Sequence, residues 1–175
     1  WNGTAYVLYA VGKYTTSALA ANGDVDGFGT VRHTQTIGES VRLEDDGVTE
    51  MKTGSYTTDA YNNAYGTLGT QTTVGESYNK IWNGTSYVLY TVGRYTTEAL
   101  ADIDGDGHLD ADGDIDGFGT VLHTRTVGES VRLDVDGTTE IATGRYTTDA
   151  YNNIYGTLGT QLTVGESLNK VWNGT

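Results

Sequence analysis

Apolar and polar residues alternate along much of this chain in short runs that are typical of β-strands. In Val41–Glu44 the apolar and charged side chains alternate with a period of two, as on a strand with one covered face. Tyr6–Tyr9 and Tyr87–Tyr90 are short runs of β-branched and aromatic residues, which favour strands. Only Thr15–Ala21 and Thr96–Ala101 carry a short helical pattern. The pattern therefore predicts an all-β fold.

The chain also repeats itself. Residues 1–81 align with residues 82–171 when residues 102–110 are treated as an insertion, and 62 of the 81 aligned positions are identical. Gly-x-Tyr-Thr-Thr and [Ile/Val]-Gly-Glu-Ser each occur four times, so each unit divides into two modules of about 40 residues. Residues 172–175 repeat the opening tetrapeptide and are interpreted as the start of a further unit. We expect a tandem A-B-A-B array.

Turn signals separate the strand-like runs and indicate how the modules connect. Asn83-Gly84 lies between two such runs, and Asp46-Gly47 and Asp136-Gly137 occupy the matching place in other modules. These dipeptides tolerate the positive φ angles of a type I′ turn, so β-hairpins are expected to join the modules. We expect β-sandwich-like pairs of modules, with β-propeller-type blades as the alternative.

Composition narrows the class of protein. The 10 basic and 23 acidic residues give a net charge of −13, which disfavours nucleic acid and anionic membrane surfaces as partners and attracts divalent cations. No apolar run is long enough to insert into a membrane as a helix. Cysteine is absent, so a bound metal is the expected substitute for disulfides in thin β-modules.

Acidic loops interrupt the first module of each unit. Residues 22–27 read Asn-Gly-Asp-Val-Asp-Gly, residues 112–117 read Asp-Gly-Asp-Ile-Asp-Gly, and the insertion adds Asp-Ile-Asp-Gly-Asp-Gly at 102–107. Ca²⁺ takes six to eight oxygen ligands, which carboxylates at alternate positions of a tight loop supply. The predicted ligands are Asn22, Asp24, Asp26, Asp102, Asp104, Asp106, Asp110, Asp112, Asp114 and Asp116.

These loops resemble the calcium loops of dockerins and thrombospondin type 3 repeats, in which Asp-x-Asp-x-Asp-Gly units bind calcium in series. The likeness covers residues 22–27 and 102–117. It implies one ion held by Asp102, Asp104, Asp106 and Asp110, and a second held by Asp112, Asp114 and Asp116. The twelfth position of the EF-hand pattern is His33 or His123 instead of glutamate, so a further ligand has to come from elsewhere.

Two further recurring features are candidate sites. Asn2, Asn83 and Asn173 each begin Asn-Gly-Thr, which accepts N-glycans in a secreted protein, although turn chemistry alone also accounts for Asn-Gly. Both interpretations stay open. A structural role is expected for the glutamates that recur in Gly-Glu-Ser, which are Glu39, Glu76, Glu129 and Glu166.

The repeats favour structure over catalysis. His33 and His123 are repeat equivalents without a serine or cysteine nucleophile in a triad-like context, so we expect no enzyme. The predicted function is a calcium-stabilised structural segment of a fibre or surface adhesin, located extracellularly or at the cell surface. Its expected partners are neighbouring repeats or chains of a filament, and glycans. The alternative is a carbohydrate-binding module that uses Trp1, Trp82 and Trp172.

Overall fold

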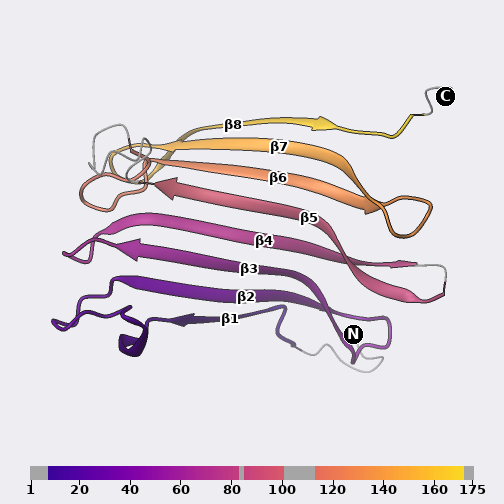
Figure 1. Cartoon of the computed structure of the whole chain (residues 1–175), viewed down its shortest axis with the longest axis horizontal. Coiled ribbons are helices and arrows are strands. Elements are labelled where there is room, and N and C mark those ends of the chain that lie inside the picture. Colours follow the sequence, from indigo (N-terminus) through magenta and orange to yellow (C-terminus); the bar gives the residue numbers. More distant parts are fainter. Residues whose placement is uncertain (1–7, 83–84, 101–112, 172–175) are drawn as a thin grey trace.

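The computed structural model describes residues 8–82, 85–100 and 113–171, which form one open antiparallel sheet. Its eight strands lie side by side in chain order, with β1 and β8 at opposite edges (Figure 1). The strands are β1 (Gly12–Ser17), β2 (His33–Leu43), β3 (Glu50–Asn62), β4 (Leu68–Trp82), β5 (Tyr87–Leu100), β6 (His123–Leu133), β7 (Glu140–Asn152) and β8 (Leu158–Ser167). A 3₁₀ helix, η1 (Ala20–Asn22), follows β1. The all-β class is confirmed.

The arrangement of the strands differs from the expected one. The described strands form a single sheet, and not sandwich-like pairs of modules or separate propeller blades. The helical expectation is also wrong for Thr15–Ser17, which lies in β1, and for Thr96–Leu100, which lies in β5. These segments are rich in threonine, whose branched side chain packs well against cross-strand neighbours. No helix in the described ranges is long and apolar enough to cross a membrane.

The strand register places equivalent residues of the repeats in rows that cross the whole sheet. One row alternates tyrosine and glycine through Tyr14, Gly38, Tyr56, Gly75, Tyr95, Gly128, Tyr146 and Gly165. Another row is threonine in every strand: Thr16, Thr36, Thr58, Thr73, Thr97, Thr126, Thr148 and Thr163. Its hydroxyl groups pair across strands, for example at 2.8 Å between Thr58 and Thr73. Each unit therefore contributes the same four-strand pattern.

The tyrosine–glycine row determines how neighbouring strands fit together. A Cβ atom at Gly38 would lie 2.3 Å from the ring of Tyr56, and one at Gly75 would lie 2.3 Å from the ring of Tyr95. Each ring thus occupies the space that a side chain on the preceding strand would need. A slip by one residue would put glutamate or a β-branched residue in that space, so the row specifies the register.

Few hydrophobic side chains are buried in this sheet. Within the described part of the chain the buried ones are Val41, Met51, Ala99, Ile115 and Val131. By contrast, the valines of the β4, β6 and β8 strands at Val74, Val127 and Val164 are 52–64% exposed. A single sheet with so small a core depends strongly on cross-strand pairs for its stability.

The turns at Asp46-Gly47 and Asp136-Gly137 lie where the sequence predicts them, but they are not type I′. Gly47 and Gly137 have φ angles of 68° and 70°, while no non-glycine residue in the described ranges has a positive φ. The N–H of Gly47 donates to the carbonyl oxygen of Glu44, which closes a tight turn ahead of the left-handed glycine. The predicted turn at Asn83-Gly84 lies outside the described residues.

Candidate functional site

The junction between the two units is the pairing of β4 with β5. Their ladder runs from the Thr70–Leu100 pair to the Trp82–Tyr87 pair, with one irregularity after Ser77. At its outer end the rings of Trp82 and Tyr87 meet edge to face, with centroids 5.3 Å apart. The second unit therefore continues the sheet of the first through main-chain hydrogen bonds and side-chain contacts.

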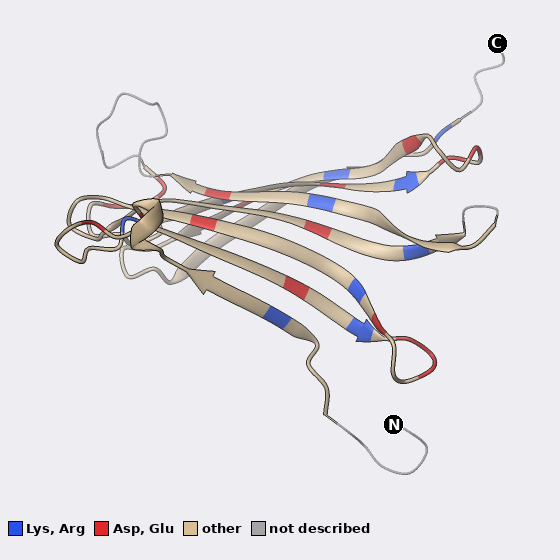
Figure 2. Cartoon of the chain, turned by 60° about the horizontal axis from the view of Figure 1, so that its bottom comes forward, with Lys and Arg blue, Asp and Glu red and all other residues tan. Residues whose placement is uncertain are grey.

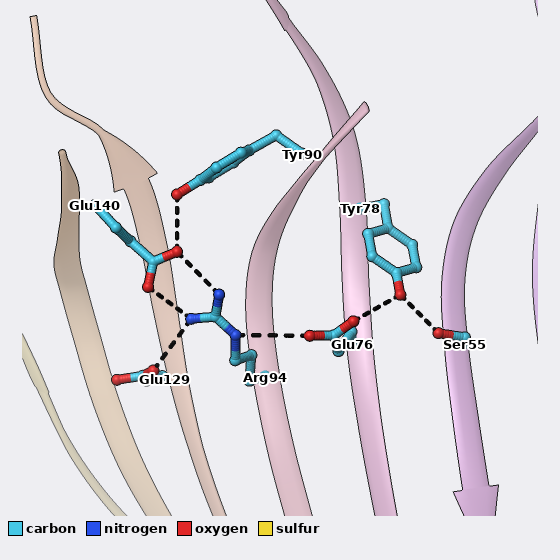
Figure 3. Close-up of polar contacts among 7 residues, drawn as sticks. All are labelled: Ser55, Glu76, Tyr78, Tyr90, Arg94, Glu129 and Glu140. Atoms are coloured by element: carbon cyan, nitrogen blue, oxygen red, sulfur yellow. Dashed lines mark hydrogen bonds and ion pairs between the residues drawn. The ribbon is translucent and has the colours of Figure 1, made fainter. Parts of the chain in front are cut away.

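Arg94 on β5 is the centre of a polar network at this junction (Figure 3). Its Nη1 and Nη2 donate to the two carboxylate oxygens of Glu140 at 2.7 and 2.9 Å, which is a bidentate pair. Nη1 also lies 3.4 Å from Glu129 on β6, and Nε lies 3.6 Å from Glu76 on β4. One guanidinium group thus links carboxylates from both units.

Two tyrosines extend the network over five strands, β3 to β7. The hydroxyl group of Tyr78 donates to Glu76 at 2.7 Å and lies 2.8 Å from the Ser55 hydroxyl on β3. The hydroxyl group of Tyr90 donates to Glu140 at 2.8 Å. The hydrogen bond from Arg94, with that from Tyr90, lowers the pKa of Glu140 to about 2. The hydrogen bond to Glu140, with a further contribution from Glu129, holds the pKa of Arg94 above its ordinary value. Arg94 and Glu140 therefore stay charged, and their contacts help to hold the strands in place.

Acid titration tests this network. The folded-state pKa of Glu140, about 2, lies below its ordinary value of 4.5. Ionised Glu140 therefore contributes its full stabilisation above pH 4.5, and this contribution is lost as the pH falls from 4.5 to about 2. We expect Glu140→Gln to lower the melting temperature at pH 6. Between pH 4.5 and 2.5 the melting temperature of this variant should fall less than that of the unmodified chain. Glu98→Gln, at an exposed position of β5, is the control and should leave the pH dependence of the melting temperature unchanged.

An open groove of about 830 Å³ lies beside the network on the same part of the sheet. Its floor includes Val74, Val127 and Val164, and Arg94 and Arg145 lie along it together with glutamates. The charged residues belong to one cross-strand row, which contains Lys13, Glu39, Ser55, Glu76, Arg94, Glu129, Arg145 and Glu166. Figure 2 shows charged bands recurring on successive strands. The groove is therefore lined by one row in which valine alternates with threonine and by a second row in which glutamate alternates with arginine.

The structure describes half of the predicted calcium ligands. Asn22 ends η1, and Asp24, Asp26, Asp114 and Asp116 lie in the loops that lead into β2 and β6. The others lie outside the described residues, as do the asparagines of the three sequons: Asp102, Asp104, Asp106, Asp110, Asp112, Asn2, Asn83 and Asn173. Calcium binding by the acidic residues 102–116 thus stays a prediction from sequence.

In the first loop the carboxylates bind the chain itself. Asp24 accepts the N–H of Leu19 at 2.9 Å, and Asp26 accepts the N–H groups of Phe28 and Thr30, each at 2.9 Å. The Leu19 N–H, together with His33, lowers the pKa of Asp24. The described ranges contain no group of three or more histidine, cysteine or acidic residues placed to hold a metal ion. The hydrogen bonds that Asp24 and Asp26 accept from backbone N–H groups help to order this loop.

Each loop is tied to the sheet by a histidine between two aspartates, which sequence reasoning missed. In the first unit the Nδ1 and Nε2 atoms of His33 lie 3.0 Å from Asp24 and 3.0 Å from Asp59. The ring stacks on Tyr61 at a centroid distance of 4.3 Å. Hydrogen bonding to Asp24, with a contribution from Asp59, raises the pKa of His33, since both nitrogens can donate only when the ring is protonated. The same arrangement recurs around His123.

No family model matches this chain, and no curated protein or solved structure matches it either.

Proposed function

We propose that this chain is a structural tandem-repeat segment of an extracellular fibre or surface adhesin, in which each unit adds four strands to one sheet. The observation that carries this proposal is the β4–β5 ladder, which joins the units strand to strand. Repeat proteins built in this way are quasi-one-dimensional, because each unit contacts only its neighbours along the array. A chain in which residues 1–171 precede residues 1–175 tests this, because its sheet should lengthen by a constant step for each unit.

The size of the core supports an architectural role. Few hydrophobic side chains are buried, and the cross-strand rows recur in both units. An array gains stability each time a further strand pairs with its edge, so repetition offsets the thin core. The Arg94–Glu76 ion pair, at 3.6 Å, adds an ionic link across the junction of the two units. In this proposal the repeats serve to make the sheet stiff.

Calcium binding at residues 102–116 is part of the same proposal and rests on the acidic motif. A cation held only by the folded chain raises its melting temperature by mass action. EGTA should therefore lower the melting temperature by several degrees relative to millimolar calcium, and should expose this segment to protease. The Asp104→Ala and Asp106→Ala changes together should remove that difference, and magnesium should replace calcium poorly. Equal melting curves with and without EGTA would contradict calcium stabilisation.

Carbohydrate binding is the second candidate function. The observation in its favour is the exposed aromatic pair at the junction, where Trp82 and Tyr87 are 57% and 68% exposed. Exposed aromatic rings at the end of this ladder offer flat apolar faces on which sugar rings stack. Calorimetric titration with oligosaccharides decides between the candidates, since binding that is lost in Trp82→Ala would favour the carbohydrate-binding module.

A further inference from the structure

The two edge strands carry the two sequences that pair with each other inside the chain. β8 repeats Leu68–Ser77 of β4 with one difference, Leu162 in place of Thr72. β1 repeats Gly93–Glu98 of β5, with Lys13 in place of Arg94 and Ser17 in place of Glu98. β4 pairs with β5, whereas β8 and β1 lie at opposite edges of the sheet. The free edges are therefore the two halves of an existing ladder.

Side chains near the two edges are exposed, whereas the equivalent side chains at the junction are more covered. Leu8 is fully exposed, while its equivalent Leu89 is 46% exposed. Val171 is 81% exposed, while its equivalent Ile81 is half-buried. Residues 8–11 and 168–171 also lie outside strands, although their equivalents 89–92 and 78–81 belong to β5 and β4. A pairing strand beside each edge would cover these residues, as it does at the junction.

The tyrosine–glycine row is complementary at the two edges. At the junction the ring of Tyr95 lies across Gly75 of the preceding strand. At one edge its equivalent Tyr14 is 75% exposed. At the other edge a Cβ at Gly165 would have backbone and Cβ atoms of β7 as its nearest neighbours, and no ring atom is among them. One edge thus presents an exposed tyrosine, and the other presents an uncovered glycine.

We propose that β8 of one molecule pairs antiparallel with β1 of a second copy of this chain, in the register of the β4–β5 ladder. This inference rests on the proposed structural function and names its partner. Tyr14 of one copy lies opposite Gly165 of the next, and Thr16 lies opposite Thr163. Lys13 lies opposite Glu166, as Arg94 lies opposite Glu76 within the chain. Because the two edges differ, the contact is heterologous, and each added copy leaves the same two edges free to continue the sheet.

Cysteine cross-linking tests the register, since the chain has no cysteine of its own. Residues directly opposite in an antiparallel ladder have Cα atoms about 4.5–5.5 Å apart, within the span of a disulfide. Oxidation of a chain carrying Thr16→Cys and Thr163→Cys should give covalent oligomers that increase with protein concentration. Thr16→Cys with Leu162→Cys, displaced by one residue onto the opposite face, should give at least fivefold fewer. Thr73→Cys with Thr97→Cys is the internal standard and should cross-link within one molecule.

Three results would overturn the proposal. One is a purely monomeric product from the Thr16/Thr163 variant while the internal standard cross-links. Another is a disulfide between these two positions within a single molecule, which would mean that the sheet closes on itself. The third is equal cross-linking in the displaced pair. If the edges fail to pair while a four-unit chain still forms one long sheet, the proposed function stands and only the second copy is excluded.

Sedimentation of the unmodified chain gives an independent readout. Tyr14→Ala should weaken self-association at least tenfold, because the ring that covers Gly165 is lost, while the monomer keeps its fold. Tyr65→Ala is the matched control, since Tyr65 is 91% exposed in a turn away from both edges. An association constant that is unchanged by Tyr14→Ala, or lowered equally by Tyr65→Ala, would contradict pairing through this edge.

Discussion

Gly75→Ala is expected to lower the free energy of unfolding by about 1–2 kcal/mol, although alanine is the better strand residue by about 0.5–1 kcal/mol. The added Cβ would lie 2.3 Å from the Tyr95 ring, so the ring has to move away from the β4 backbone. In a Tyr95→Ala background the same change should leave stability unchanged or raise it. Urea denaturation of the four proteins of this double-mutant cycle measures the reversal.

The matched control for this cycle lies on the same strand. A Cβ at Gly69 would have the carbonyl oxygen of Tyr61 as its nearest neighbour, at an ordinary 3.5 Å. Gly69→Ala should therefore leave stability unchanged or raise it by up to about 1 kcal/mol, equally in both backgrounds. If Gly75→Ala has the same effect with and without the Tyr95 ring, the tyrosine–glycine row does not hold the strands together.

Asp114→Ala is expected to cost about 1–3 kcal/mol, because it removes a buried carboxylate that serves as partner to two part-buried polar groups. Asp114 is 5% exposed, and its carboxylate accepts the N–H of Leu100 at 3.0 Å and bonds to the ring of His123. It also precedes Ile115, the one fully buried large side chain in the described ranges, which packs in a cluster with Ala99. Loss of the carboxylate therefore removes contacts of this loop with both β5 and β6.

Two variants separate this role from calcium binding. Asp114→Asn keeps an acceptor for the Leu100 N–H and should lose less stability than Asp114→Ala. Glu98→Ala, at an exposed position of β5, should lose little stability. Each variant is measured in calcium and in EGTA. A loss that persists in EGTA supports the hydrogen-bonding role, whereas a loss confined to calcium would assign Asp114 to the metal alone.

The strand character and two of the turn positions were predictable, but the arrangement of the strands was not. Period-two alternation such as that of Val41–Glu44 predicts a strand whether its covered face meets a second sheet or only neighbouring side chains. Sandwich and open sheet therefore give the same local pattern. Tyr95 and Gly75 each recur in motifs found four times, but only the strand register shows that one lies opposite the other. A search for paired motifs across hairpins could have found this row.

The candidate site divides in the same way. The aspartates of the first loop were singled out for their spacing, but their backbone partners depend on the path of the loop. His33 and Asp59 are 26 residues apart, so no local motif links them. Their recurrence as His123 and Asp149 at the same separation was the available signal. No sequence pattern pointed to Arg94, because its role depends on carboxylates that three other strands bring together.

Small-angle X-ray scattering of a four-unit chain, residues 1–171 followed by residues 1–175, tests most directly the claim that units extend one sheet. Neighbouring strands are about 4.8 Å apart, so eight further strands add roughly 38 Å along the array, reduced somewhat by twist. The account predicts a particle that lengthens in one direction at constant cross-section relative to the two-unit chain. A compact particle with a radius of gyration of roughly 20 Å, as expected for a globular chain of this length, would contradict it.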